Sequence, residues 1–302
     1  MTSPYSITIF IYNRPDKVRA LLDSLKKNQH FETYEYYIFS DGPKRKSDRK
    51  KIFESREIIK KFFKDLNFHL ISRKKNLGLA KSVIQGVSYV MNFHKSTIIL
   101  EDDLILSNNF LKFMKESLEK YKESNNIYSI SGHMFDSKKI FEIKSSFFLN
   151  NINSWGWATW DNRWEKFVSF LEEFKDMSLS KREKYFFDLE NSYPFSKILR
   201  KTNRGEIDSW AIKWYLFVFK NHGLSLYPNN SLILNNGFDG SGTNTFSTLN
   251  NELNKRPFEI KFPKRIELNE KGYNLYKSEI KNNLNPPVYK KLLLKIKSII
   301  KK

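Results

Sequence analysis

Three acidic residues follow a short apolar segment. The segment 97–100 (TIIL) is β-branched and apolar, which predicts a buried strand, and Glu101, Asp102 and Asp103 come directly after it. Carboxylate oxygens suit hard divalent cations such as Mn²⁺ and Mg²⁺, and such a cation can also bridge a diphosphate. An acidic surface turn is the alternative interpretation. The position at the end of a strand, in a chain rich in cations, favours a metal site.

Polar side chains also follow the three preceding predicted strands. They are Asn13 and Arg14 after strand 6–12, Asp41 after strand 34–40, and Arg73 after strand 67–72. Because α/β proteins bind ligands beyond the carboxyl ends of parallel strands, we expect these side chains and the acidic cluster to converge at one edge. The alternatives are an ordinary turn at Asp41 and a solvated basic turn after Arg73.

Helical periodicity separates the predicted strands. Apolar residues recur at helical spacing within 18–25, 48–63, 79–90 and 110–118, and Ser107 is the expected N-cap of the last helix. Parallel neighbours need crossover connections, which are usually helical, so the alternation predicts an α/β fold with a mostly parallel, Rossmann-like sheet. The chain lacks G-x-G-x-x-G after its first strand and lacks a P-loop motif, so dinucleotide and P-loop sites lose their main support.

The second half of the chain has a different character. Residues 153–164 (NSWGWATWDNRW) contain four of the six tryptophans, which predicts an aromatic subregion. Segment 208–219 is expected to be helical, 224–234 to form one or two strands, and 235–245 to be a Gly-rich loop. The five histidines lack metal-binding spacing and are expected to be structural, with His133 the one near a site edge.

Composition limits the classes of function. The 302 residues carry 53 Lys and Arg against 33 Asp and Glu, and the net charge of +20 suits phosphates, nucleic acid or an anionic membrane as a partner. The absence of cysteine excludes disulfides and thiol chemistry. Apolar runs are far shorter than the roughly 20 residues of a membrane span, and no secretory signal is apparent, which favours a cytoplasmic protein.

The order of the motifs resembles a known family. NRP, SDGPK, NLGLAKS, LEDDL, SWGWATW and DSWAIKW, within about residues 6–250, are similar to motifs of the GT-A nucleotide-sugar glycosyltransferases. More narrowly, the chain resembles bacterial surface-glycan transferases that are distantly like N-acetylglucosaminyltransferase I. The resemblance implies a nucleotide-sugar-binding half over 1–132, an acceptor-side and catalytic half of the same GT-A domain over 133–250, and a C-terminal extension over 251–302.

The resemblance also implies donor-binding roles. Asp41 would accept the imide hydrogen of uracil, while Asn13 and Arg14 would line the base and the ribose. The residues expected near the diphosphate or the donor sugar are Arg73, Lys75, Asn76 and Gly78, where the glycine allows close approach. Asp103 would be the principal ligand of Mn²⁺ or Mg²⁺, assisted by Asp102 and Glu101.

On the acceptor side, Asp208 matches the acid expected to act as general base in an inverting transfer, although an Asp before a helix is also a good N-cap. Trp155, Gly156, Trp157 and Trp210 are the candidates for contact with sugar. Large aromatic residues also dominate protein cores, so a core role is the alternative for the tryptophans. The family often has a histidine where this chain has Asn244, which leaves a metal or phosphate role for Asn244 unsupported.

The expected function is transfer of a sugar, most simply from a UDP sugar, to a glycan or lipid-linked glycan of the bacterial surface, such as lipopolysaccharide or capsule. The segment from Lys290 has six lysines, no acid and an apolar arc, which predicts a basic amphipathic helix. Contact with the anionic inner face of the plasma membrane is one hypothesis for this helix, and docking on the protein's own surface is the other.

Two other classes of function compete with glycosyl transfer. Charge and aromatic content also suit a non-catalytic protein that binds single-stranded nucleic acid, but such a protein gives no reason for acids at the ligand edge of the sheet. A metal-dependent phosphotransferase or nuclease could use the same carboxylates. Apart from Asp41, no further acids follow the other predicted strands, which weakens that alternative. We therefore expect no nucleic-acid partner.

Overall fold

Four parallel strands form the first half of a large sheet. The computed structural model describes residues 5–135, 137–174, 177–237, 253 and 258–284. The parallel strands are β1 (Ser6–Ile11), β2 (Glu35–Ser40), β3 (Phe68–Ser72) and β4 (Ser96–Glu101), in the spatial order β3-β2-β1-β4. Ile9 pairs with Ile38 on one side and with Leu100 on the other. The carboxyl ends of these strands therefore lie at one edge, which confirms the predicted parallel arrangement.

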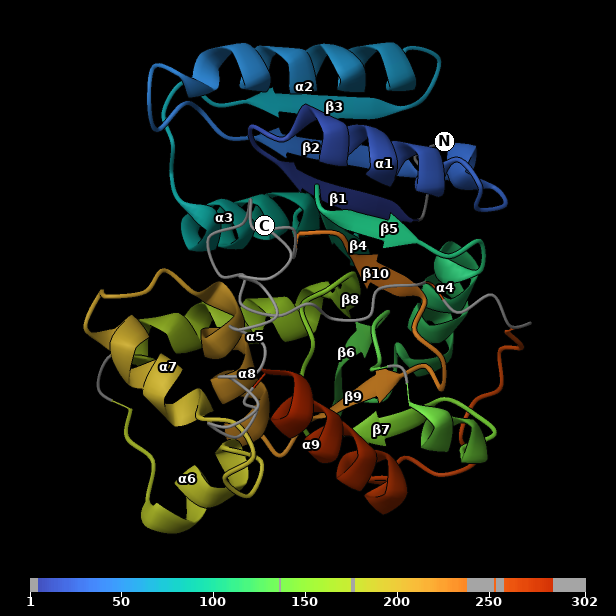
Figure 1. The fold of residues 1–302 in the computed structure, drawn as a ribbon, viewed down its shortest axis with the longest axis vertical. Helices are drawn as coiled ribbons and strands as arrows, with labels where there is room; N and C mark the ends of the chain where they lie inside the picture. Colours follow the sequence, from blue (N-terminus) through green and yellow to red (C-terminus); the bar gives the residue numbers. More distant parts are fainter. Residues whose placement is uncertain (1–4, 136, 175–176, 238–252, 254–257, 285–302) are drawn as a thin grey trace, which may run out of the picture.

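Helices cover both faces of this half-sheet. α1 (Pro15–Leu25) and α2 (Asp48–Phe63) lie against one face, and α3 (Leu79–Met91) lies against the other (Figure 1). Side chains alternate between the faces along β1, so Ile9 packs in the core cluster of α1 and α2 while Phe10 packs with α3. Cover on both faces explains why every residue of β1 and β2 is buried.

The same sheet continues into the second half of the chain. β8 (Trp157–Trp160) lies antiparallel between β4 and β6 (Ile127–Ser131), followed by β9 (Leu224–Tyr227) and the edge strand β7 (Phe147–Leu149). The eight strands therefore form one mixed, mostly parallel sheet, which contains strands from both sides of residue 132 in the chain. The short strands β7 and β8 were not predicted from the sequence, because their identity depends on pairing with distant strands.

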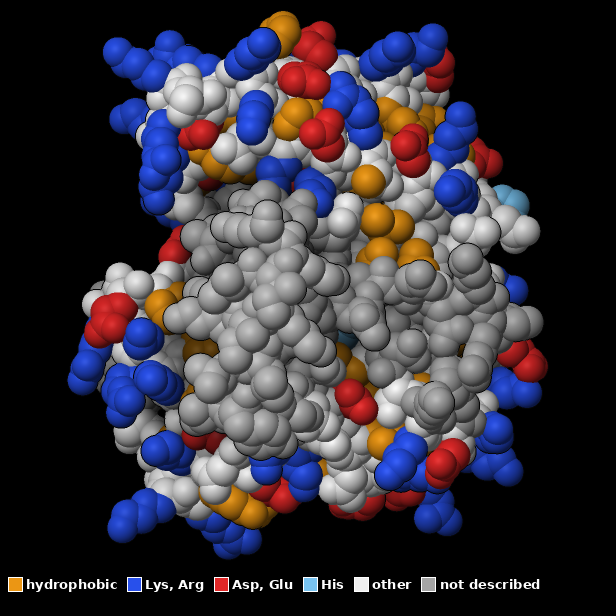
Figure 2. Space-filling model, viewed as in Figure 1, with side chains coloured by type: hydrophobic (Ala, Val, Ile, Leu, Met, Phe, Trp, Pro, Cys, Tyr) orange, Lys and Arg blue, Asp and Glu red, His pale blue; other side chains and the backbone are white. Residues whose placement is uncertain are grey.

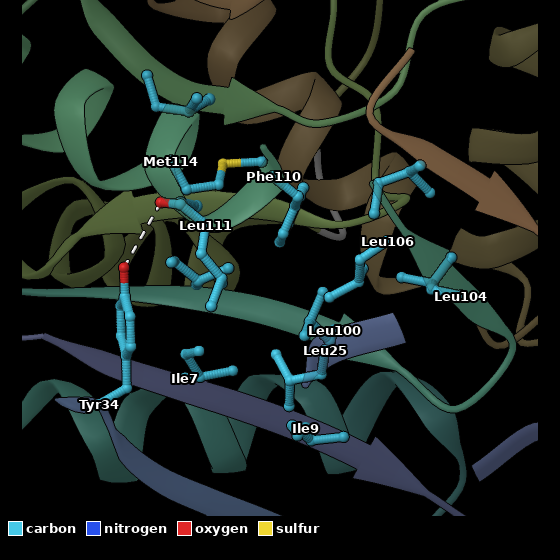
Figure 3. Close-up of a cluster of buried hydrophobic side chains, with 14 of the residues drawn as sticks. Ile7, Ile9, Leu25, Tyr34, Leu100, Leu104, Leu106, Phe110, Leu111 and Met114 are labelled. Carbon is cyan, nitrogen blue, oxygen red and sulfur yellow. Dashed lines mark hydrogen bonds between the residues drawn. The ribbon is translucent and has the colours of Figure 1, made fainter. Parts of the chain in front are cut away.

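A two-stranded sheet extends beyond the acidic cluster. β5 (Leu104–Leu106) pairs antiparallel with β10 (Ile233–Asn235), and α4 (Phe110–Tyr121) follows β5. The buried side chains beneath them come from β1, α1, β4, β5 and α4 (Figure 3). The prediction that Ser107 caps this helix is wrong: Asn109 occupies the N-cap, and the carbonyl of Ser107 accepts a hydrogen bond from the amide of Phe110 at 3.1 Å.

The remaining helices come from the second half of the chain and pack around the rest of the large sheet. They are α5 (Asp161–Glu173), α6 (Lys181–Phe187), α7 (Phe195–Asn203), α8 (Trp210–Lys220) and α9 (Glu270–Leu284); short 3₁₀ turns span Phe31–Thr33 and Lys138–Glu142. α5 and α8 pack beside α3 around a buried tryptophan cluster, and α9 lies beside β7 (Figure 1).

Several expectations fall on residues outside the described ranges. Asn244 and the predicted basic amphipathic helix lie there, so they remain predictions. Within the described residues, no helix combines the length and the apolar composition that crossing a bilayer requires. On the face shown in Figure 2, the Lys and Arg side chains of the described residues are scattered around the rim of the molecule and do not form one stripe.

Candidate active site

An arginine bridges two of the three carboxylates at the end of β4. Because β4 runs parallel to β1, the residues that follow these two strands are neighbours. The guanidinium of Arg14 donates from Nη1 to Oδ2 of Asp103 at 3.0 Å and from Nη2 to Oδ1 of Asp102. The amide of Tyr12 donates to Oδ2 of Asp102 at 3.1 Å. The structure therefore brings the first and the fourth predicted strand ends together, as expected.

Negative charge is crowded and buried in this cluster. Burial, and then repulsion from Asp103 and Asp102, raises the pKa of Glu101 to about 8. Burial raises the pKa of Asp102 to about 6, although the charge of Arg14 acts in the opposite direction. Burial lowers the pKa of Arg14, but the two aspartates outweigh it and hold that pKa above its usual value. A cation bound here would relieve the repulsion between the carboxylates.

Asp103 is more accessible to a metal ion than Asp102. Its side chain is 15% exposed, against 3% for that of Asp102. A Cβ on Gly237 would lie 2.5 Å from Oδ2 of Asp103, so glycine leaves space beside the carboxylate. No group of three or more His, Cys, Asp or Glu side chains in the described chain is arranged to hold a metal. The carboxylate of Asp103 would fit a hard divalent cation whose other ligands would come from a bound ligand and from water.

The segment after β10 approaches the same cluster. The amide of Asn236 donates to the carbonyl oxygen of Asp103 at 2.7 Å, and Nζ of Lys17 donates to the carbonyl oxygen of Asn236 at 2.6 Å. These contacts fix the main chain where the Gly-rich segment begins. The sequence placed a loop there but gave no signal that it meets Asp103.

Asp41 lies at the carboxyl end of β2 and is 7% exposed. Its Oδ2 accepts a hydrogen bond from the amide of Leu77 at 2.8 Å, and its Oδ1 accepts one from the amide of Gly42 at 3.2 Å. A Cβ on Gly42 would lie 2.6 Å from the backbone of Lys75, so the turn after β2 packs directly on the turn after β3. Asp41 is therefore more than an ordinary turn residue, because it orders the segment that leads into α3.

Arg56 of α2 holds these two turns together, a role that was not predicted from the sequence. Its Nε donates to Oγ of Ser40 at 2.8 Å, and its Nη2 donates to the carbonyl oxygens of Ser40, Asp41 and Arg73 at 3.3, 3.4 and 3.0 Å. A guanidinium has several donors in a rigid plane, so one side chain can bind carbonyls from both turns. In the sequence, Arg56 is one of many cations on an amphipathic helix, which gives no signal of this role.

The remaining donor-side candidates lie along the same strand ends. Nδ2 of Asn13 donates to Asp48 at 3.0 Å, and Nδ2 of Asn76 donates to the carbonyl oxygen of Gly42 at 3.0 Å. Arg73 donates to Oγ of Ser82 and lies over the ring of Phe39 at 5.4 Å. The carbonyl oxygen of Lys75 accepts a hydrogen bond from the amide of Gly42 at 3.2 Å. These four residues organise the turns.

Asp208 precedes α8 in the chain, but its side chain contacts the N-terminus of α3. Its Oδ2 accepts a hydrogen bond from the amide of Ala80 at 3.3 Å, and a Cβ on Gly78, where φ is +80°, would lie 2.6 Å from the same oxygen. The N-cap of α8 is Ser209, whose Oγ accepts from the amide of Ile212 at 3.4 Å. The expected alternative role of Asp208, as cap of α8, is therefore wrong.

Two of the tryptophans expected to contact sugar belong to the core. Trp157 and Trp210 are 1% and 2% exposed, and their rings stack with centroids 5.0 Å apart. Their indole faces are covered by protein, so the expectation that they contact a sugar ring is corrected. Trp155 is only partly buried, and Gly156, with φ +58°, accepts a hydrogen bond from the amide of Gly132 at 2.7 Å. A Cβ on Gly156 would lie 2.6 Å from the side chain of Ile233, so this glycine allows close packing within the protein. The expected contact of Trp155 and Gly156 with sugar stays a prediction.

His133 lies beside this pair. Its ring packs edge-on against Trp155 with centroids 4.5 Å apart, and its Nδ1 lies 3.2 Å from Nδ2 of Asn153. Burial lowers the pKa of His133 to about 3, so the ring is neutral at physiological pH. His133 is therefore a neutral packing group, in agreement with its expected structural role, and its place at a site edge stays a prediction.

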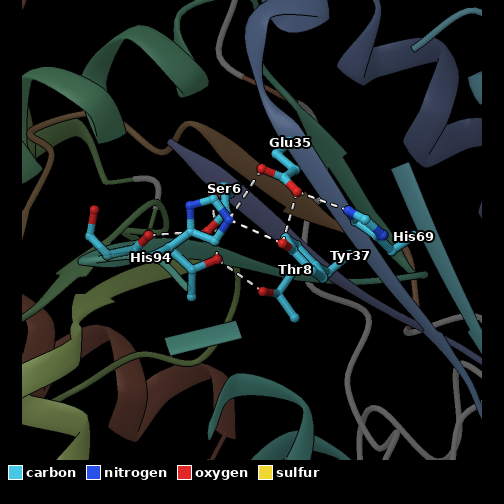
Figure 4. Close-up of polar contacts among 8 residues, drawn as sticks. Ser6, Thr8, Glu35, Tyr37, His69 and His94 are labelled. Carbon is cyan, nitrogen blue, oxygen red and sulfur yellow. Dashed lines mark hydrogen bonds and ion pairs between the residues drawn. The ribbon is translucent and has the colours of Figure 1, made fainter. Parts of the chain in front are cut away.

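A second polar cluster lies at the opposite edge of the sheet. Glu35, the first residue of β2, accepts hydrogen bonds from Tyr37 at 2.9 Å and from His69 at 2.8 Å, and lies 3.4 Å from His94 (Figure 4). Burial opposes ionisation of Glu35, but the hydrogen bonds from His69 and Tyr37 outweigh it and lower its pKa. Glu35 and Asp41 are six positions apart along β2, which spans about 20 Å, so the histidines of this cluster lie away from the strand ends that carry Asp41.

Several solved structures are similar to this chain at low identity and with TM-scores below 0.5. TarS 1-349 of S. aureus in complex with UDP matches with a TM-score of 0.46 and 12% identity, over 77% of this chain and 59% of that one. The mannosyltransferase PcManGT of Pyrobaculum calidifontis, in complex with GDP-Man and Mn²⁺, matches with a TM-score of 0.40 and 8% identity, over 74% and 73%. GalNAc-T7 with UDP, GalNAc and Mn²⁺ gives 0.44 and 9%, over 76% and 42%.

The sequence itself gives a firmer result. No curated protein matches the chain. The family model described as glycosyl transferase family 2 matches residues 6–163, which include β1 to β4, the acidic cluster and the Arg56 contacts. This match covers more than half of the 302 residues, and the chain belongs to glycosyl transferase family 2.

Proposed function

We propose that the protein transfers a sugar from a UDP sugar to a hydroxyl group of a bacterial surface glycan, with inversion at the anomeric carbon. One observation carries the proposal: the short segment from Leu77 to Ala80 binds Asp41 at one end and Asp208 at the other. A nucleotide held at Asp41 and a base at Asp208 would therefore share one rigid support. Membership of glycosyl transferase family 2 supports a nucleotide sugar as the donor.

The nucleotide would bind along the ends of β1 and β2. A carboxylate oxygen has two lone pairs, so the amides of Leu77 and Gly42 orient Asp41 and still leave acceptor capacity for the imide N–H of uracil. Asn13 lies at the end of the neighbouring strand, where it would reach the base or the ribose. Arg73, Lys75 and Asn76 would adjoin the diphosphate or the donor sugar.

Asp103 would hold a divalent cation, Mn²⁺ or Mg²⁺, with Asp102 and Glu101 behind it. The bound cation would supply charge neutralisation for the diphosphate leaving group. The space left by Gly237 and the partial exposure of Asp103 support this assignment. Asp102 is deeply buried and bonded at both oxygens, so we expect it to position Asp103 and Arg14 rather than to coordinate.

Asp208 would act as the general base. The acceptor oxygen forms a bond to the anomeric carbon, the bond from that carbon to the phosphate oxygen breaks, and the hydroxyl proton passes to the Asp208 carboxylate. The Ala80 amide fixes Oδ2 of this carboxylate at the N-terminus of α3, where the positive end of the helix dipole favours an anion. Attack from the side opposite the leaving group gives the inverted anomer.

The acceptor would enter beside Trp155 and Gly156. The electron-rich face of an indole suits the apolar C–H face of a sugar ring. A glycan or lipid-linked glycan acceptor is consistent with a protein that works at the inner face of the plasma membrane, and the basic segment 288–302 would provide contact with anionic lipid. This membrane contact should weaken as salt rises, because exposed charges are screened within about 10 Å at 0.1 M.

The test is nucleotide release from a panel of UDP, GDP and CMP sugars with Mn²⁺ and an oligosaccharide acceptor. We expect release from a UDP sugar, and we expect UDP with Mn²⁺ to raise the melting temperature while single-stranded oligonucleotides do not. The Asp103→Asn variant should lose metal-dependent UDP binding, because a hard cation needs the charge of the carboxylate. Stabilisation by oligonucleotides and none by UDP with Mn²⁺ would contradict the proposal.

A further inference from the structure

The proposed metal site already contains a cation, which is the guanidinium of Arg14. We propose that Arg14 is the resident counter-charge of Asp102 and Asp103 in the nucleotide-free protein, and that its transfer to the nucleotide diphosphate couples metal binding to nucleotide binding. This inference rests on the proposed function. It assigns Arg14 a role in the order of binding, in place of the contact with base and ribose expected from the sequence.

The geometry supports a resident counter-charge. Arg14 forms ion pairs with both aspartates at once, through Nη1 to Asp103 at 3.0 Å and through Nη2 to Asp102. Its side chain is 25% exposed, so three quarters of it is withdrawn from solvent. Arg14 is the residue before α1, and Pro15 begins that helix, which fixes the backbone from which the guanidinium reaches the carboxylates.

The same carboxylate cannot serve both cations well. Asp103 is the proposed metal ligand, and one oxygen of its carboxylate, Oδ2, already accepts the hydrogen bond from Nη1 of Arg14. A divalent cation arriving alone would meet a fixed positive charge and would find one protein carboxylate in place of the six or more oxygens that it prefers. Binding of metal alone is therefore expected to be weak.

A diphosphate removes both obstacles. Its oxygens complete the coordination of the cation, and they also offer the planar guanidinium a bidentate partner as good as the carboxylates. Arg14 can then leave Asp103 without losing its counter-ions. Because coupling between two ligands is reciprocal, metal would tighten nucleotide binding by the same factor by which nucleotide tightens metal binding.

The experiment measures Mn²⁺ affinity with and without UDP, by the electron paramagnetic resonance signal of free Mn²⁺, in wild type and in Arg14→Gln. The matched control is Arg19→Gln. Arg19 lies on α1 and also pairs with two carboxylates, Asp16 at 3.2 Å and Glu54 at 2.7 Å, but at the exposed surface. Solution binding of Mn²⁺ to UDP is subtracted from the titrations.

In Arg14→Gln, Mn²⁺ alone should bind at least about tenfold more tightly than in wild type, and the coupling factor between Mn²⁺ and UDP should fall by about the same factor. Arg19→Gln should match wild type. Wild type that binds UDP with Mn²⁺, together with an unchanged Mn²⁺ affinity in Arg14→Gln, would overturn the inference and leave the proposed function standing. Absence of UDP binding to wild type would instead contradict the proposed function.

A conservative variant covers the case in which Arg14→Gln does not fold, because that substitution leaves buried carboxylates without their partner. Arg14→Lys keeps the charge but cannot donate in parallel to both aspartates. The coupling factor between Mn²⁺ and UDP in Arg14→Lys should be smaller than in wild type but greater than one. A coupling factor in Arg14→Lys equal to that of wild type would also overturn the inference.

Discussion

The carboxylate of Asp208 accepts a hydrogen bond of 3.3 Å from the amide of Ala80, although 128 residues separate the two in the chain. This bond attaches the segment before α8 to the N-terminus of α3. Gly78 lies against the same carboxylate oxygen, so the proposed base is held by the turn that also orders Asp41. Donor-side and acceptor-side residues are thus joined through one short stretch of backbone.

Asp208→Asn should lose at least about a hundredfold in kcat, because an amide cannot accept the hydroxyl proton. Its melting temperature and UDP affinity should change little, since the amide oxygen of Asn can still accept from the Ala80 amide. Ser209→Ala is the matched control: it removes the cap of α8, which is worth about 1 kcal/mol, and should keep kcat near wild type. Steady-state kinetics and thermal denaturation check both variants. Full activity in Asp208→Asn, or an α product from an α-linked donor, would contradict a role as base.

Gly78→Ala should lower kcat by more than the loss of folded protein explains. Alanine at φ +80° is strained, and its Cβ would lie 2.6 Å from Oδ2 of Asp208, so the carboxylate must move. Gly205→Ala is the comparison, because Gly205 also has positive φ, +73°, but nothing lies within 4 Å of its Cβ position. Gly205→Ala should lose about 1 kcal/mol in free energy of unfolding, measured in urea, and Gly78→Ala should lose more, because φ +80° with ψ 158° is a backbone region that only glycine adopts readily. Equal activity in the two variants would show that the position of Asp208 does not matter.

Arg56→Ala should weaken UDP binding and destabilise the protein by about 2 kcal/mol, because it removes a charged donor from three carbonyl oxygens at once. Arg56→Lys should recover only part of both losses, since a lysine cannot reproduce the planar fork. Arg49→Ala, on the exposed side of the same helix, should be neutral. Calorimetric titration with UDP and Mn²⁺ checks the first effect. If Arg56→Ala bound UDP as wild type does, the two turns would need no such clamp.

Acid should destabilise the fold in part through His133. Burial lowers its pKa in the folded protein to about 3, whereas an unfolded histidine has a pKa near 6.5. Below a pH of about 6.5, His133 binds a proton in the unfolded state but not in the folded state. The free energy of unfolding therefore decreases as the pH falls, until about pH 3. Burial also lowers the pKa of His94, which acts in the same direction.

The measurement is the free energy of unfolding of wild type and of His133→Gln between pH 7.5 and 5. Each histidine contributes a slope of at most about 1.4 kcal/mol per pH unit, so the variant should lose stability less steeply than wild type. The comparison between the two proteins cancels the opposite contributions of Glu101 and Asp102, whose raised pKa values favour the folded state as pH falls. If the free energy of unfolding of the two proteins changed in parallel with pH, His133 would not contribute to acid destabilisation.

The parallel half of the sheet was predictable because its signals are local. Runs of β-branched and aromatic residues define β1 to β4, and α2 spans 48–63 in the structure as its periodicity predicts. Once the strands are parallel, the residues that follow them must lie at one edge, which places Asp41 and Asp103 there without any knowledge of side-chain contacts.

The second half was less predictable, because short strands derive their structure from their partners. The three or four residues of β7 and β8 have no period long enough to identify, and β8 becomes a strand by pairing with β4 and β6. The aromatic segment likewise could be a core or a platform for sugar. Packing against α3 and α8 decided that Trp157 and Trp210 are core.

The contacts that define the candidate site were decided by the tertiary structure alone. Arg14 reaches Asp102 and Asp103, Arg56 reaches two different turns, and Asp208 caps a helix that is not its own. The amino-acid sequence determined which chemical groups stand at the strand ends, because local patterns place strand ends. It could not determine which groups meet, because those contacts depend on strand register and helix packing between segments far apart in the chain.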